Sequence, residues 1–367
     1  MRFANALAWH CREVAAGLLE AGHEVFVLAQ RDSPLASWLQ RDGIPCDIRA
    51  NLNRVTPKEV YLAGKVVRDT LRLFRPDVLN PHCPPGHFYL SLHRKRHAPE
   101  ATLVRTVGEP RPPKRNFVNR RLHQTGADGI IVTCEASRQR YLRRFRLEPE
   151  KVQVIYPGFD GKAFANYTPS GKFRQRYGIP NHAKLVGVVA RLSPEKGHRV
   201  LLEAFSRVHQ DFPEARLLIV GADAREQTAK DLAEFARVLH SHQQVIFTGE
   251  VADVREVMAE LDLAVIPSVR SEAICRVALE YMTWKIPIIA TNVNILPEVV
   301  RDGVNGWVVP VGDAAALSRA LGEALQNESE RKKRGAQGRE LVLSEFSRAR
   351  MIERTLDFYR LSGARAR

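Results

Sequence analysis

The chain has 367 residues, and 56 Lys and Arg residues outnumber 41 Asp and Glu residues, which gives a net charge of +15. This length predicts two domains of ordinary size, and a hydrophobic share of 44% is enough for their cores, so wholesale disorder is excluded. Neither a run of about 18 apolar residues nor a signal-peptide pattern is found, so no membrane-spanning helix and no secretion are expected.

The first half of the chain begins with a helical pattern over residues 3–20 and not with a strand. Short apolar runs then predict strands, and longer amphipathic patterns predict helices. The expected strands are 25–29, 77–80, 102–106, 129–133 and 152–155, and the expected helices are 57–74, 114–124 and 137–146. A doubly wound domain normally opens with a strand, so its first strand and the turn after it are missing from this pattern.

The second half alternates strands and helices more regularly. Short runs of Val, Ile and Leu are typical of parallel strands that helices cover on both faces. The expected strands are 185–190, 216–220, 245–247, 263–266, 286–290 and 307–309, and the chain is helical after about residue 327, with a last helix over 351–361.

The predicted fold class is therefore α/β, with two doubly wound, Rossmann-like domains that bind a ligand in the cleft between them. Prolines and glycines interrupt both periodicities between residues 156 and 180. We expect an N-terminal domain over 1–165, a C-terminal domain over 166–345, and a terminal helix within 346–367 that packs back on the first domain.

The excess positive charge lies in the first half. Residues 1–180 hold 30 basic and 16 acidic residues, a net charge of +14, whereas residues 181–367 hold 26 and 25, a net charge of +1. The three densest clusters are 94–96, 111–121 and 138–146. This charge predicts a polyanionic partner for the first half, namely nucleic acid, an anionic membrane or a phosphorylated ligand. Few aromatic residues are interspersed and no nucleic-acid reading motif is found, so a membrane surface is favoured.

Two motifs in the second half carry the candidate chemistry. In the first, Arg191 and Lys196 follow a predicted strand at the turn into a helix, and together they offer a guanidinium fork and a mobile ammonium group to a diphosphate. In the second, Glu272 and Glu280 follow another strand, eight residues apart, and one helix would hold them about 12 Å apart on neighbouring faces. The amides of Ile274 and Cys275 would then meet phosphates at the N-terminus of that helix.

In this order and spacing, the segments resemble the retaining glycosyltransferases of the GT-B class known as family 4, of the kind that build lipopolysaccharide or other bacterial surface glycans. The matching residues are 191–197, 218–221, 247–249, the pair Glu272 and Glu280, 297–300 and 303–306, with looser matches at 22–25, 75–78 and 154–158. The likeness covers most of 150–325 and, more loosely, 13–150.

The resemblance implies a role for each matching position. Arg191 and Lys196 would neutralise the departing nucleotide diphosphate, and Glu272 would contact the transferred sugar. Glu280 would hold the ribose hydroxyls. The remaining donor contacts would come from the backbone of Gly249 and Val251 and of Ala273, Ile274, Cys275 and Arg276.

The resemblance further implies transfer of a hexose or heptose, with retention of configuration, to a membrane-linked glycan or lipid. The donor would be a nucleotide-diphospho-sugar of the UDP, GDP or ADP type, and neither a cofactor nor a metal would be required. His82 and Gly108 would lie on the acceptor side. Five scattered cysteines without a CxxC pair are typical of a reduced, cytoplasmic protein, here expected at the inner face of the plasma membrane.

Departures from the family pattern leave other functions open. Ala273 and Cys275 stand where glycines are usual, and Gly108 stands where a histidine often follows the strand. The alternatives are a sugar-nucleotide epimerase of the same fold, a binding module that has kept the donor pocket but lost transfer, and a basic nucleic-acid-binding protein. If the chain begins at Met1, weak or absent transfer is expected.

Overall fold

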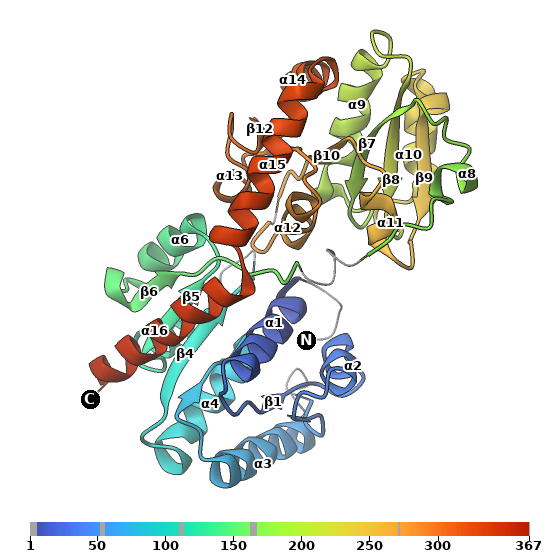
Figure 1. Ribbon diagram of the computed structural model, residues 1–367. Helices are drawn as coiled ribbons and strands as arrows, with labels where there is room; N and C mark the ends of the chain where they lie inside the picture. The colour runs from blue at the N-terminus through green and yellow to red at the C-terminus, as the bar shows by residue number, and fades with distance from the viewer. Residues whose placement is uncertain (1–5, 52–55, 110–113, 162–166, 271, 367) are drawn as a thin grey trace. The chain divides into compact units, whose positions relative to one another are not determined.

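The computed structural model describes residues 6–51, 56–109, 114–161, 167–270 and 272–366 (Figure 1). These residues form two compact units. The first unit comprises the chain up to Gly158 together with the residues from Phe346 onward, and the second runs over Phe159–Glu345. Both units are built from parallel strands and helices, which confirms the predicted α/β fold class.

The first unit alternates short strands with helices of very different length. Its elements are α1 (Ala6–Glu20), β1 (Val27–Leu28), α2 (Pro34–Arg41), β2 (Cys46–Asp47), α3 (Pro57–Phe74), β3 (Val78–Leu79), α4 (Pro84–His97), β4 (Thr102–Val107), α5 (Phe117–Gln124), β5 (Gly129–Val132), α6 (Glu135–Phe145), the 3-10 turn η1 (Pro149–Lys151), β6 (Val152–Val154) and α16 (Arg348–Ala366). Helix α3 has the predicted bounds because the Thr56 hydroxyl accepts a hydrogen bond from the Glu59 amide and Pro57 occupies the first turn.

The strands of the first unit fall into two parallel sheets. Strands β3, β4, β5 and β6 pair in that order, and β1 pairs with β2 in a separate sheet of two strands. Among the residues that the structure describes, no strand pairs with both sheets to join them, and the first element is the helix α1. The parallel arrangement places the carboxyl ends of β3 and β4 at one edge of their sheet.

The last helix, α16, packs on α1, β4 and β5 of the first unit (Figure 1). Ile352 of α16 lies so close to Gly17 of α1 that a Cβ atom on Gly17 would come within 2.5 Å of its side chain. Arg348 forms ion pairs with Glu13 at 3.3 Å and with Glu20 at 2.8 Å. The C-terminal segment therefore completes the core of the first unit.

The second unit is a single parallel sheet of six strands in the order β12-β11-β10-β7-β8-β9. Its elements are α8 (Phe173–Arg176), β7 (Lys184–Val189), η2 (Pro194–Lys196), α9 (His198–Val208), β8 (Ala215–Val220), α10 (Ala229–Val238), η3 (His242–Gln244), β9 (Val245–Gly249), α11 (Val254–Met258), β10 (Leu263–Ile266), α12 (Arg276–Thr283), β11 (Ile288–Thr291), α13 (Leu296–Val299), β12 (Gly306–Val309), α14 (Ala314–Gln326) and α15 (Glu328–Ser344). Each strand predicted for this half is present.

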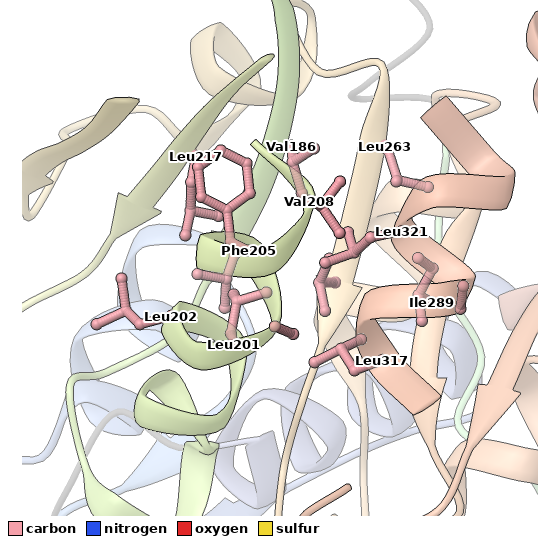
Figure 2. Close-up of a cluster of buried hydrophobic side chains, with 14 of the residues drawn as sticks. Val186, Leu201, Leu202, Phe205, Val208, Leu217, Leu263, Ile289, Leu317 and Leu321 are labelled. Carbon is pink, nitrogen blue, oxygen red and sulfur yellow. The ribbon is translucent and has the colours of Figure 1, made fainter. Parts of the chain in front are cut away.

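The core of the second unit lies between the sheet and helices α9 and α14. Figure 2 shows Phe205 and Leu201 of α9 and Leu317 of α14 among the side chains of the strands, where Val186 and Ile289 are fully buried. Burial of apolar side chains of this size stabilises a fold by roughly 1.5–3 kcal/mol each. This packing holds the carboxyl ends of β7 and β10 side by side, and the loops that follow those two strands carry the candidate site.

Two further observations bear on the chain as a whole. None of the helices in the described part of the chain combines the length and the apolar character that crossing a bilayer requires. All five cysteines are free thiols.

Candidate functional site

The loop that follows β7 carries Arg191 and Lys196 and is held at both ends. The Leu192 amide donates to the carbonyl of Ala222 at 2.9 Å, and the Val269 amide donates to the carbonyl of Glu195 at 2.8 Å. Lys196 ends the 3-10 turn η2, and α9 begins two residues later. The loop is therefore tied both to the residues after β8 and to those after β10.

Gly197 is required for this close approach. Its φ of 73° lies in the left-handed region, and a Cβ atom at this position would come within 1.9 Å of the Pro267 carbonyl oxygen. A side chain would have to push the loop away from the end of β10. The glycine therefore sets the distance between the two halves of the candidate site.

The side chains of Lys196 and Glu272 form an ion pair that joins the two loops. Glu272 is 4% exposed, and its carboxylate also accepts a hydrogen bond from the Ser268 hydroxyl at 2.6 Å. Ser268 is held in turn by Thr291, whose hydroxyl donates to the Ser268 carbonyl oxygen at 2.6 Å. Burial opposes the charged form of Lys196, but the Glu272 carboxylate raises the pKa of Lys196 above its ordinary value.

The prediction that Glu272 and Glu280 lie on one helix is wrong. Helix α12 begins at Arg276, and Glu272 lies in the irregular segment before it, just ahead of a bend at residues 273–274. Three bonds explain this: the Glu272 side chain is held by Lys196 and Ser268, and its backbone carbonyl oxygen accepts from the Ile295 amide at 3.2 Å. Because these bonds lead the backbone off the helical path, Ile274 lies in the bend and Cys275 is the N-cap residue.

Glu280 lies on α12 and is 4% exposed. Arg276, one turn earlier on the same helix, donates from Nε to the Glu280 carboxylate at 2.6 Å. Burial raises the pKa of Glu280, and the charge of Arg276 only partly opposes this shift. The Tyr281 hydroxyl accepts from the Val189 amide at 2.9 Å, and this bond ties α12 to the end of β7.

The other predicted donor residues lie at the same edge of the sheet, on separate loops. Arg191 is exposed, and its charge opposes the protonated form of Lys196, which indicates that the two cations lie near one another. Gly249 ends β9 with a φ of 68°, and its carbonyl oxygen accepts from the Gly221 amide at 3.0 Å. Val251 follows two residues later and is half-buried. The buried residues Ala273 and Cys275 line the bend between Glu272 and α12.

Sequence reasoning did not find Ser268, Thr291 or the Arg276 side chain as parts of this site. The first two act through a hydrogen bond from Ser268 to Glu272, and no sequence pattern marks such a bond. The spacing of Arg276 and Glu280 by four residues was a usable signal, because side chains at that spacing on a helix are neighbours.

In the first unit, His82 and Gly108 lie at the carboxyl edge of the sheet. His82 follows β3, Gly108 follows β4 directly, and both are buried. Asn80, which the sequence did not single out, places its side-chain oxygen, a hydrogen-bond acceptor, 2.6 Å from His82 Nε2. Among the described residues, no group of three His, Cys, Asp or Glu side chains could hold a metal ion.

Comparison with known proteins places these observations in context. The family model described as "Glycosyltransferase Family 4" matches residues 7–162, and the model "Glycosyl transferases group 1" matches residues 170–341. EpsD of Bacillus subtilis (strain 168), assigned as a glycosyltransferase, is 31% identical over 353 residues, which cover 93% of this chain and 90% of that protein. A D-inositol 3-phosphate glycosyltransferase of Corynebacterium kroppenstedtii is 27% identical over 266 residues, 70% of this chain and 58% of that protein.

Solved structures share the fold. A glycosyltransferase from Rickettsia africae superposes with a TM-score of 0.85 at 20% identity, covering 98% of this chain and 95% of that one. Anabaena HepE in complex with UDP superposes with a TM-score of 0.83 at 21% identity, covering 97% and 99%. WaaG, a glycosyltransferase involved in lipopolysaccharide biosynthesis, superposes with a TM-score of 0.66 at 18% identity, covering 100% and 97%.

Proposed function

Because this chain belongs to the family 4 glycosyltransferases of GT-B fold, which use nucleotide sugars, we propose that it moves a hexose or heptose from a nucleotide-diphospho-sugar to a membrane-linked glycan or lipid, with retention of configuration. The observation that carries the proposal is the ion pair between Lys196 and Glu272, together with the buried carboxylate of Glu280 on the helix that follows Glu272. These relatives are glycosyltransferases, so epimerisation, donor binding without transfer and nucleic-acid binding are not favoured.

The donor takes its contacts from residues 166–345. Lys196 and Arg191 face the diphosphate, whose negative charge grows as the glycosidic bond breaks. Fixed cations therefore stabilise the transition state more than the bound donor. Two cations supply this charge without a metal ion. Glu272, released from Lys196, binds hydroxyls of the sugar, and Glu280 binds those of the ribose.

The backbone holds the rest of the donor. Gly249 and Val251 contact the base, and the bend at Ala273, Ile274 and Cys275, together with Arg276 at the first turn of α12, contacts the phosphates. Structures of HepE hold UDP or UDP-glucose, which makes UDP-sugars the first donors to test. The acceptor binds residues 1–165, beside His82 and Gly108, and the helix within 346–367 supports that part.

The donor assignment predicts opposite effects of one substitution on stability and on binding. Because burial raises the pKa of Glu280, its carboxylate costs free energy in the donor-free protein at pH values above that pKa. The Glu280→Gln variant is therefore expected to unfold at the same temperature as wild type or higher at pH 8. A nucleotide sugar at 100 times its Kd should stabilise wild type by about 2.7 kcal/mol, and it should stabilise the variant much less.

Thermal unfolding of both proteins with a panel of UDP-, GDP- and ADP-sugars makes this measurement, and calorimetry with the matching nucleotide gives the Kd. The proposal fails if no nucleotide sugar stabilises wild type. The assignment of Glu280 to the donor fails if the variant and wild type are stabilised equally.

We further propose that the basic first half lies against the inner face of the plasma membrane, which makes the protein cytoplasmic and peripheral. The segment 114–121 supports this proposal. Phe117 is 76% exposed and Val118 is 54% exposed at the first turn of α5. Lys114, Arg115, Arg120 and Arg121 are exposed around them, and no acidic residue lies between Glu109 and Asp128. Anionic lipid attracts such a segment by about 1 kcal/mol per basic residue, and buried aromatic area adds to this.

Sedimentation with phosphatidylglycerol vesicles is expected to carry the protein down at low salt and less at high salt, because salt screens the attraction. Replacing Phe117 and Val118 by serine should reduce binding at both salt concentrations. The matched control is Val238→Ser on α10, an exposed apolar residue of the nearly neutral second half. Equal binding to phosphatidylcholine vesicles, or a preference for duplex DNA over both lipids, would contradict the proposal.

A further inference from the structure

Two buried histidines lie side by side in the first unit. His82 follows β3 and is 8% exposed, and His10 on α1 is 2% exposed. Their ring centroids are 5.8 Å apart. Among the described residues, neither Nδ1 atom has a hydrogen-bond partner. Because a buried polar atom without a hydrogen-bond partner is energetically unfavourable, this arrangement favours binding of a ligand at these nitrogens.

The side-chain amide of Asn80 determines which nitrogen of His82 carries the proton. Its nitrogen donates to the carbonyl oxygen of Val104 and, at 2.9 Å, to the hydroxyl of Thr106. A reversed amide would set two carbonyl oxygens against each other at Val104, so the orientation is determined by the hydrogen bonds. The Asn80 oxygen therefore faces His82 Nε2 at 2.6 Å. Since that oxygen can only accept, Nε2 must be the protonated nitrogen.

The second nitrogen of His82 is then unprotonated. Burial lowers the pKa of His82 well below its ordinary value, and the neighbouring His10 and Arg105 lower it further, so the ring carries a single proton at neutral pH. Nδ1 therefore presents a buried lone pair. A lone pair accepts a hydrogen bond and repels an anion, so it fits a hydroxyl group and not an ionised phosphate.

We propose that His82 Nδ1 accepts a hydrogen bond from a hydroxyl of the acceptor, and that Asn80 is the positioning residue that holds the ring in the required tautomer. This inference rests on the proposed function, because it identifies an acceptor contact for that reaction. It assigns an atom and a direction to the contact, and it gives Asn80 and Thr106 a role. A buried water molecule at Nδ1 is the competing occupant that the experiments exclude or establish.

The tautomer of His82 can be measured by NMR, without an activity assay. In protein labelled with ¹⁵N-histidine, a two-bond ¹⁵N–¹H correlation distinguishes protonated from unprotonated ring nitrogens, and the His82 signals are assigned by their loss in His82→Asn. We expect a protonated Nε2 and an unprotonated Nδ1 in wild type, and a mixture of tautomers in Asn80→Ala. Methyl and octyl glycosides of glucose, galactose, mannose and N-acetylglucosamine, added with UDP, should shift the Nδ1 signal. A protonated Nδ1, or a signal that no glycoside moves, overturns the inference.

Kinetic measurements on two variants then distinguish the contributions of the two ring nitrogens to acceptor binding. Asparagine at position 82 places its amide oxygen near the position of Nδ1, and glutamine places its amide nitrogen near that of Nε2. With UDP-glucose as donor and octyl glucoside as acceptor probe, His82→Asn should change the acceptor KM by less than about threefold. His82→Gln should raise the acceptor KM about tenfold, the equivalent of one hydrogen bond. Neither should change the donor KM.

The inference is overturned if the two variants have equal acceptor KM values, or if the acceptor KM of His82→Gln is lower than that of His82→Asn. Either result would show that His82 acts only through Asn80. Wild type that consumes no nucleotide sugar with any glycoside of the panel contradicts the proposed function instead. In that case the NMR titration still decides whether a hydroxyl binds at Nδ1, so the two failures are distinguished.

Discussion

Replacing Lys196 by alanine is expected to lower kcat/KM by a factor of about 10² to 10³, the loss typical of one preorganised group that stabilises transition-state charge. The variant loses the ammonium group that we propose faces the departing diphosphate. It also leaves the Glu272 carboxylate, 4% exposed, without its ion-pair partner, although the Ser268 hydroxyl still donates to it. Removal of one partner from a buried pair is destabilising, so a lower melting temperature is expected as well. Initial rates at varied donor concentration and thermal unfolding make the two measurements.

A double variant separates catalysis from stability. Glu272→Gln removes the unpaired charge, and its amide can still bond with the Ser268 hydroxyl. Lys196→Ala combined with Glu272→Gln is therefore expected to recover most of the lost melting temperature. Its activity should remain far below that of Glu272→Gln alone, and at least about 10²-fold below wild type, because the cation is still absent. If activity recovered together with stability, Lys196 would have only a structural role and the donor-site assignment would be wrong.

Acid is expected to unfold the first unit between about pH 6.5 and pH 4. Burial lowers the pKa of His10 and of His123 from 6.5 to about 4, and the same cause lowers the pKa values of His82 and His87. In this pH range the unfolded chain binds protons that the folded unit excludes, so stability falls as the pH falls. A pKa shift of this size lowers the free energy of unfolding by on the order of 3 kcal/mol for each of His10 and His123. Hydrogen exchange at a series of pH values would show whether the loss of stability is confined to the first unit.

His123 offers a matched test of this pH dependence. Its ring stacks on Phe145 at 4.3 Å and its Nε2 has no partner among the described residues, so phenylalanine fits the space and gives up the hydrogen bond from Nδ1 to the Asn119 carbonyl oxygen, 2.7 Å long. His123→Phe should make the urea-unfolding free energy less dependent on pH between 6.5 and 4. The control is His23→Gln, an exposed histidine before β1, which should leave the dependence unchanged. An unchanged slope in His123→Phe would mean that burial of this ring does not drive acid unfolding.

Much of the fold could be predicted because the determining signals are local. Helix α3 has the predicted bounds, since its capping residue and first-turn proline are adjacent in the chain. The strands of the second unit were found from continuous apolar runs, which are typical of strands covered on both faces. Strand β2 and helix α4 were missed: β2 has only two residues, and α4 begins with two prolines and ends in a basic run that hides its apolar face.

In the candidate site, too, some features follow from local sequence and others only from tertiary contacts. The sequence by itself determined the family and predicted which residues bind a nucleotide sugar, because motif order and spacing are properties of the chain. It also placed nearly all the excess charge in the first half. Only the tertiary structure decided that Glu272 lies before α12, where Lys196 pairs with it, and that the Asn80 oxygen faces His82 Nε2. These contacts join segments that meet only when parallel strands bring their carboxyl ends together, and hydrogen bonds formed there outweigh the local helical preference that residue spacing suggested.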